Sequence, residues 1–253
     1  MVDPLVKRAK AFLQSRQIGP WDASFLNGTV ALLEALGRTL GRVDGQAVVL
    51  DAGCGREDCY AKKVRFGSKI SRLVGVDIRE DVDNHTSLDL AIRANVYALP
   101  FGSAQFDVAF SDFVLEHLED PERAVAEVAR VLRPGGRFVF RTPNIYHYVP
   151  VAAMLLQKMG YHPVERFSAN DDRHEVFPTF YRANTYWRLM ELANRNSFVI
   201  EEMIFAEGGP HYLEFFFPFY LVGLVHQYLV NKVRLLYGLR GNIIGVFRKI
   251  ETG

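Results

Sequence analysis

Short apolar runs that end in turn residues alternate with amphipathic segments through most of the chain. Apolar runs of roughly four to eight residues between turn residues are typical of strands buried in a parallel sheet. By this criterion, strands are predicted at 46–53, 72–77, 91–96, 106–112, 137–143, 198–205 and 242–250. The segment near 91–96 is the weakest of these. A parallel sheet is the arrangement that this pattern favours.

Helical periodicity lies between most of the predicted strands, as βαβ units require. One helix starts at Pro121, which suits a first turn, and is closed by Gly135 and Gly136. The complete set of predicted helices is 4–16, 24–40, 58–67, 121–134 and 185–196. The pattern loosens from 144 to 184, where aromatic residues and histidines accumulate. An α/β fold follows from this alternation.

The chain divides by pattern into a helical extension at 1–46 and one domain at 47–253. This domain contains two insertions, at about 145–184 and 209–240. The second insertion contains the apolar stretch 212–230, which is interrupted by Glu214, Pro218, Gly223, His226 and Gln227. These interruptions disfavour a membrane-spanning helix. Three interpretations of 209–240 stay open: a cover for the core and the acceptor pocket, a homodimer interface, or a peripheral membrane contact followed by basic residues.

Composition narrows the class of protein only a little. The 253 residues include 30 basic and 29 acidic side chains, so no overall field attracts nucleic acid. The two cysteines, Cys54 and Cys59, match neither a disulfide framework nor a zinc site, which favours a reducing, cytoplasmic setting. The first residues contain no apolar signal-peptide core. No metal is expected, because the histidines lack ligand spacing.

The stretch VVLDAGCGRED at 48–58 carries the first chemical signal. Gly53 and Gly55 follow a strand, as they do in loops that hold a pyrophosphate. However, the third glycine position of that motif is Asp58, and Asp51 and Glu57 add two more acids. A phosphate would be repelled by each of them by about 1 kcal/mol or more. The loop therefore suits a ligand that has a cationic group and no phosphate.

S-adenosylmethionine is a ligand of this kind, since it carries an ammonium, a sulfonium and a ribose diol. Asp77 ends the next predicted strand and can accept both ribose hydroxyls, as an acid does for the ribose of NAD. The segments VVLDAGCG, LVGVD and ALPFGSAQFDVAFSDFVLEHLEDPERAVAEVARVLRPGGRFVFRTPN resemble the class I S-adenosylmethionine-dependent methyltransferases, in particular the type 11 group. The resemblance runs over about 47–144.

This resemblance implies a Rossmann-like, doubly wound, mostly parallel sheet with a C-terminal antiparallel strand. It also implies that the cofactor S-adenosyl-L-methionine contacts Asp51, Gly53, Cys54, Gly55, Asp77, Ile78, Asn95, Val96, Tyr97, Ser111 and Phe113. Two positions depart from the family pattern. Glu57 replaces a glycine, and Asn95 replaces an acid while keeping a carbonyl for the adenine amine.

The acceptor is expected beyond the carboxyl ends of the fourth and fifth strands. His117 and His147 are the candidate catalytic bases, because imidazole titrates near working pH. His117 also has a packing interpretation, since the LEHL sequence is typical of the family. The candidate substrate contacts are Glu116, Asn144, Tyr148, His174, Tyr181 and Arg182. Glu116 has the alternative of a surface acid on a helix, and Arg182 that of an ion pair with Asp171 or Asp172.

The leading hypothesis is an enzyme that methylates a small-molecule or lipid-like acceptor. A nucleic-acid methyltransferase is the second, disfavoured because a basic stripe and the motif of base amino-methylating enzymes are missing. The third is a non-catalytic binding module that has lost the cofactor, which Glu57 and Asn95 keep open.

Overall fold

The computed structural model describes residues 2–16, 27–55, 69–158 and 177–250. The chain separates into two compact units, which are described one at a time. The sheet unit comprises 31–142, 179–204 and 244–253, and the helical unit comprises 1–30, 143–178 and 205–243. The division into a helical extension at 1–46 and a domain at 47–253 stays a prediction. Residues 31–41 cluster with the sheet.

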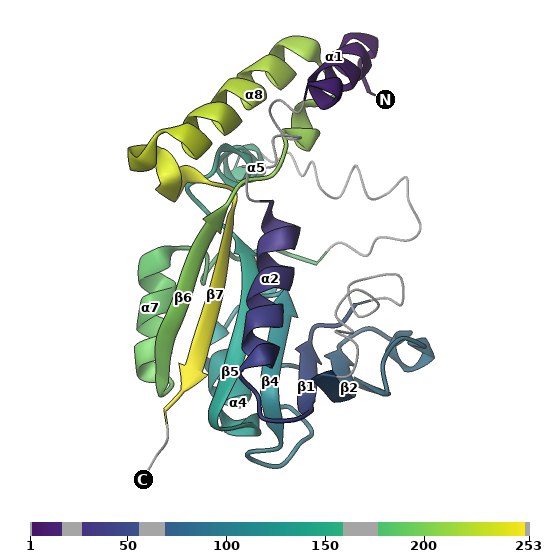
Figure 1. Ribbon diagram of the computed structural model, residues 1–253, viewed down its shortest axis with the longest axis vertical. Coiled ribbons are helices and arrows are strands. Elements are labelled where there is room, and N and C mark those ends of the chain that lie inside the picture. Colours follow the sequence, from purple (N-terminus) through teal and green to yellow (C-terminus); the bar gives the residue numbers. More distant parts are fainter. Residues whose placement is uncertain (1, 17–26, 56–68, 159–176, 251–253) are drawn as a thin grey trace. The chain divides into compact units, whose positions relative to one another are not determined.

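A seven-stranded sheet forms the sheet unit, with strand order β3-β2-β1-β4-β5-β7-β6. The first five strands pair in parallel, and Figure 1 shows β7 running opposite to β6. This is the doubly wound, mostly parallel sheet with an antiparallel C-terminal strand that the sequence resemblance implied. The strand bounds are β1 Ala47–Ala52, β2 Ile70–Asp77, β3 Leu90–Arg93, β4 Phe106–Asp112, β5 Leu132–Pro143, β6 Phe198–Ala206 and β7 Asn242–Lys249.

Helices cover both faces of this sheet, with α2 in front of it and α4 and α7 behind it in Figure 1. Helix α2 (Gly28–Gly41) buries an alanine and leucine stripe that includes Leu32 and Leu36. Helix α4 (Pro121–Val131) begins where the Asp120 side chain accepts the Arg123 amide at 3.1 Å. Helix α7 (Tyr186–Arg195) is capped in the same way by Thr185. Such caps satisfy backbone amides that a helix leaves unpaired.

The first part of β5 differs from the prediction of a helix closed by two glycines. Leu132 already pairs with Phe106, and the register then jumps so that Arg137 pairs with Val108. The residues between them bulge from the strand, with Gly135 at φ +75°. A side chain at Gly136 would meet the Arg133 carbonyl oxygen at 2.8 Å. The glycines therefore form a bulge inside β5 rather than the end of the helix.

The helical unit contains α1 (Pro4–Ser15), α5 (Tyr148–Lys158) and α8 (Phe217–Lys232), with 3₁₀ turns at His211–Leu213 and Arg234–Leu239. Helix α5 was missed by the sequence prediction. Asp3 joins the first and last of these helices, because its carboxylate accepts the amides of Leu5 at 2.8 Å and Phe217 at 3.0 Å. No described helix is both long and apolar enough to cross a membrane.

Candidate functional site

The strand order places a ligand crevice at the carboxyl end of the sheet. The order reverses between β1 and β4, and open α/β sheets bind their ligands at such a reversal. Three aspartates lie at the carboxyl ends of neighbouring strands: Asp51 in β1, Asp77 in β2 and Asp112 in β4. This edge of the sheet is consequently acidic.

The loop after β1 turns sharply and closes onto β2. Gly53 and Gly55 adopt φ values of +88° and +63°, which side chains with a Cβ rarely adopt. The amide of Gly53 donates to the Val76 carbonyl at 2.8 Å, and the amide of Gly55 donates to Asp77 Oδ2 at 2.9 Å. Asp77 Oδ1 accepts the amide of Arg79 at 3.1 Å. Asp77 thus fixes the loop and still has free lone pairs on both oxygens.

Asp51 is the most constrained of the three acids. It is 2% exposed, and its Oδ2 has no hydrogen-bond partner among the described residues. Burial raises the pKa of Asp51 well above its usual range, and the nearby charges of Asp112 and Asp77 raise it further. A positively charged group placed here would lower that electrostatic cost. The three acids therefore fit a cationic ligand and oppose an anionic one.

An ion pair joins the carboxyl ends of β4 and β5. Arg141 Nε and Nη2 donate to the two oxygens of Asp112 at 2.6 and 2.7 Å. The guanidinium also lies over the ring of Phe113, 4.1 Å from its centroid, and Phe113 is held at φ +56°. A two-pronged pair of this kind has a defined geometry. It fixes the residues that follow β4.

Glu116 lies next to this ion pair and is 4% exposed, so it is not a surface acid. Its carboxylate accepts a long hydrogen bond of 3.4 Å from Thr142 Oγ1, which in turn accepts from Asn184 Nδ2 at 2.7 Å. Its carbonyl oxygen accepts the amides of Phe180 at 2.8 Å and Tyr181 at 3.2 Å. Burial raises the pKa of Glu116 to about 8, and the charge of Asp112 adds to the rise. At neutral pH this side chain is mostly a neutral acid.

We expect Glu116→Gln to flatten the dependence of stability on pH. The folded chain keeps a proton on Glu116 that the unfolded chain loses above its ordinary pKa of 4.5, so the free energy of unfolding falls as pH rises from about 5 to 8. The glutamine variant lacks this loss, which linkage puts at up to about 4 kcal/mol. Urea unfolding at pH 5, 7 and 9 measures it. The exposed neighbour provides the control: Glu119→Gln should follow the wild type, and equal slopes in all three proteins would contradict the burial argument.

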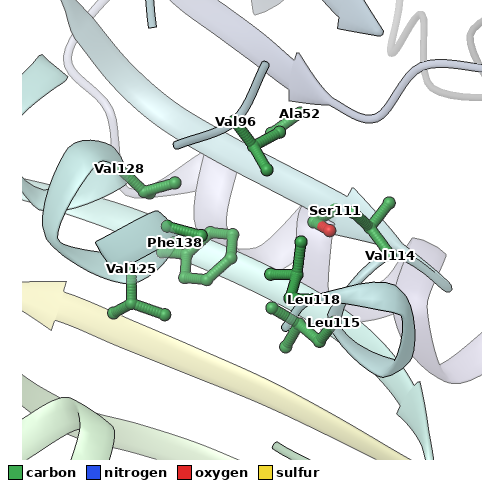
Figure 2. A pocket seen from close by; sticks show the side chains of 10 residues that line it. Ala52, Val96, Ser111, Val114, Leu115, Leu118, Val125, Val128 and Phe138 are labelled. Carbon is green, nitrogen blue, oxygen red and sulfur yellow. The ribbon is translucent and has the colours of Figure 1, made fainter. Parts of the chain in front are cut away.

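A small cavity lies beneath this edge, between β4, β5 and α4 (Figure 2). Its volume is about 10 Å³, room for roughly one water molecule. Val96, Leu115, Phe138 and Ser111 are among its lining residues, and the Ser111 Oγ is buried without a hydrogen-bond partner among the described residues. A cavity of this size cannot hold a nucleoside. A ligand of nucleoside size would need the open acidic edge instead.

Comparison with known proteins identifies this acidic edge. Residues 50–140, which contain Asp51, Asp77 and Asp112, match the family described as methyltransferase domain. Residues 50–140 belong to the class I S-adenosylmethionine-dependent methyltransferase family. S-adenosylmethionine is the cofactor of that family.

Individual relatives agree with the methyltransferase family. A "probable S-adenosylmethionine-dependent methyltransferase" of Mycolicibacterium smegmatis is 36% identical over 110 residues, which are 40% of this chain and 40% of that protein. The ubiquinone biosynthesis O-methyltransferase of Pseudoalteromonas translucida is 30% identical over 134 residues, or 47% of this chain and 56% of that protein. An S-adenosylmethionine-dependent methyltransferase structure from Mesorhizobium loti shares the fold, with a TM-score of 0.54 at 16% identity over 88% of this chain and 98% of that one. The chain spans about half or less of the length of these curated relatives.

Most of the residues that were predicted to contact the cofactor lie at the acidic edge. Asp51, Gly53, Cys54, Gly55 and Asp77 form the loop and its support. The others lie around it: Ile78 and Phe113 are exposed, Asn95 accepts the amide of Tyr97 at 2.9 Å, and Val96 and Ser111 line the small cavity. The Tyr97 hydroxyl accepts the amides of Glu119 and Asp120 at 2.7 and 3.1 Å. Contact of each with the cofactor stays a prediction, and Glu57 lies outside the described residues.

The predicted acceptor residues fall into both units. In the sheet unit, Glu116, His117 and Tyr181 lie on the segments just described, and Arg182 donates to the Glu119 carbonyl at 2.7 Å. His174, Asp171 and Asp172 lie outside the described residues. The roles of this group in acceptor binding stay predictions.

Asn144, His147 and Tyr148 belong to the helical unit. Asn144 is fully buried and donates its amide hydrogens to the carbonyls of Gly238 and Arg240 at 2.7 and 2.8 Å. His147 and Tyr148 pack together, with ring centroids 4.2 Å apart. Burial raises the pKa of the Tyr148 phenol, so it stays protonated at neutral pH. Substrate contact by these three is likewise a prediction.

Sequence reasoning missed five polar residues that the structure places beside the predicted ones: Arg141, Thr142, Asn184, Glu207 and His226. A signal existed for the first two, because Arg141 and Thr142 end an apolar strand where charge is unusual. For Asn184, Glu207 and His226 no local pattern was available. Their partners are distant in the sequence.

Proposed function

We propose that the protein transfers a methyl group from S-adenosylmethionine to a small-molecule or lipid-linked acceptor. The single observation that carries the proposal is the buried Asp51, whose Oδ2 has no hydrogen-bond partner among the described residues and which lies between Asp77 and Asp112 in the part of the chain that matches the methyltransferase family. S-adenosylmethionine supplies an electrophilic methyl group on a cationic sulfur. Asp77 binds the ribose hydroxyls, and the acids of the edge favour the cationic part.

The chain's own contribution to the reaction is orientation and proton transfer. Holding a nucleophile in line with the methyl group in a site that excludes water provides much of the acceleration. A hydroxyl or amine acceptor must also lose a proton. Glu116 and His117 are the nearest titratable candidates after β4, and the raised pKa of Glu116 suits proton exchange near neutral pH.

An apolar acceptor is supported by two observations. Relatives include the sterol 4-C-methyltransferase strm-1 of Caenorhabditis elegans, 27% identical over 97 residues, and the ubiquinone enzyme above. Within the helical unit, the 209–240 segment exposes large apolar side chains such as Tyr212, Val222 and Leu235, and Lys232 and Arg234 lie beside them. An apolar surface bordered by basic residues suits a lipid surface. A homodimer through this segment is the alternative.

The test pairs a binding measurement with a search for product. Isothermal titration with S-adenosylhomocysteine should give one site per chain. Incubation with methyl-labelled S-adenosylmethionine and separate lipid and aqueous extracts should label the lipid fraction, with a mass increase of about one CH₂ group in the product. Binding without label in either extract would favour the non-catalytic module, and label confined to the aqueous extract would overturn the lipid-linked acceptor. The mass in solution separates a dimer from a monomer.

A further inference from the structure

Three side chains of the helical unit converge from three segments far apart in sequence. His147 precedes α5, Glu207 follows β6, and His226 lies on α8. One ligand atom of each lies within 4.8 Å of the other two, and His147 Nε2 is 3.5 Å from Glu207 Oε2. His147 and Glu207 are 6% and 5% exposed. All three residues belong to the helical unit.

One ring nitrogen of each imidazole is buried without a hydrogen bond to the described residues. His147 Nε2 and His226 Nδ1 have no hydrogen-bond partner among the described residues. A buried polar atom of this kind lowers stability unless something binds it. A neutral imidazole has a lone pair on one ring nitrogen, and a metal ion can bind that nitrogen. Both nitrogens are therefore suited to a metal ion.

The surroundings hold the cluster in place. Glu207 Oε2 accepts the amide of Gly241 at 2.9 Å, and the ring of Tyr148 packs against both imidazoles, with centroids 4.2 Å and 4.9 Å from those of His147 and His226. Partners of this kind orient metal ligands in known sites. The Arg240 guanidinium, within electrostatic reach of Glu207, donates to the carbonyls of Val230 and Phe205.

We propose that His147, Glu207 and His226 bind one divalent ion of the zinc type. Two imidazole nitrogens and one carboxylate oxygen are typical ligands of Zn²⁺, Fe²⁺ and Co²⁺, whereas Mg²⁺ and Ca²⁺ prefer oxygen alone. Bonds of 2.0–2.1 Å in tetrahedral geometry separate ligand atoms by about 3.3 Å. The observed 3.5 Å between His147 and Glu207 already meets this, and His226 needs at most a small side-chain rotation.

Binding has one cost and leaves one position open. With the metal on Nε2, the His147 ring carries its proton on Nδ1 and gives up the hydrogen bond from the Val149 amide, which at 3.4 Å is long and weak. Three protein ligands leave a fourth position for water or for an oxygen of a ligand, as in catalytic rather than structural zinc sites. The ion would also link the three segments of the helical unit.

Metal titration of the untagged, full-length protein tests this proposal. After treatment with chelator, the wild type should bind one equivalent of Zn²⁺ or Co²⁺, show Co²⁺ absorption bands in the visible range, and melt at a higher temperature with the metal. Mg²⁺ should have no such effect. His147→Gln and His226→Gln should each weaken binding at least tenfold. His211→Gln is the matched control, because His211 is an exposed histidine of the same unit that also faces an acid, Glu214, at 2.9 Å.

The outcomes separate the metal site from the methyltransferase proposal. Each variant is checked for folding by circular dichroism and for cofactor binding by titration with S-adenosylhomocysteine. The metal-site substitutions should leave the affinity for S-adenosylhomocysteine unchanged. Wild-type protein that binds no zinc or cobalt would overturn the metal site, as would folded His147→Gln and His226→Gln variants with wild-type affinity. If these variants do not fold, the Co²⁺ spectrum of the wild type decides the question. A Co²⁺ spectrum typical of imidazole and carboxylate ligands supports the site, and the spectrum of the hydrated Co²⁺ ion overturns it.

Discussion

Asp77→Ala should lower the affinity for S-adenosylhomocysteine by at least about 100-fold. The carboxylate is expected to accept two charge-assisted hydrogen bonds from the ribose, each with a net value of about 1.5–3 kcal/mol. The same side chain accepts the Gly55 amide at 2.9 Å and the Arg79 amide at 3.1 Å, so its removal also loosens the loop. Isothermal titration of the wild type and the variant measures the change.

Glu80→Ala is the control for this experiment. Glu80 lies three residues after Asp77, is exposed, and pairs only at the surface with Arg93 at 3.2 Å. Its removal changes the local charge equally but should alter the affinity by less than about twofold. Asp77→Asn separates the contribution of the charge from that of the hydrogen bonds, because asparagine keeps one acceptor oxygen and loses the charge. An Asp77→Ala variant that is folded and binds as tightly as the wild type would refute the role assigned to this acid.

Gly53→Ala should destabilise the protein by about 2–5 kcal/mol and abolish cofactor binding. The backbone at φ +88° costs an alanine about 1–2 kcal/mol, and the added methyl group would overlap Cγ2 of Val114. Overpacking of that kind costs about 1–3 kcal/mol more. Urea unfolding gives the loss of stability, and titration with S-adenosylhomocysteine gives the loss of binding.

The double variant Gly53→Ala, Val114→Ala separates the two causes. Truncation of Val114 removes the overlap and leaves the backbone strain, so the double variant should recover part of the stability relative to the sum of the single variants. Gly45→Ala is the matched control for backbone strain alone, since Gly45 has φ +79° and an added methyl group there meets nothing within 4 Å. If Gly53→Ala lowers the free energy of unfolding no more than Gly45→Ala does, the close approach of Val114 does not contribute to the loss of stability.

Local patterns were sufficient for the sheet and for the glycine loop that follows β1. Strands such as Ala47–Ala52 and Phe106–Asp112 are continuous apolar runs, and each ends in or next to an acid, so Asp51 and Asp77 could be expected at neighbouring strand ends. The match is good because burial on both faces leaves a strand little choice of residue. The seven-stranded order agrees with the family resemblance.

Departures from the prediction arise where local rules have two solutions. Helix α5 begins at Tyr148 with Pro150 in its first turn, where proline is tolerated although it breaks helices elsewhere. Gly135 and Gly136 could end a helix or form a bulge, and the pairing of Leu132 with Phe106 decided for the bulge. The burial of Glu116 depends on contacts between residues 26 and 42 positions apart, and the approach of Glu207 to His147 on a contact between residues 60 positions apart. Such contacts leave no periodic trace in a sequence.

The buried carboxyl of Asp51 makes the affinity for a cationic ligand depend on pH. Since burial and two neighbouring acids favour its protonated form, a cation that enters the edge favours the ionised form and expels a proton. Nucleoside capture is then accompanied by proton release, and the complex tightens in alkaline and loosens in acidic surroundings. A protein with this edge would sense pH through its cofactor even if its chemistry had no pH-dependent step.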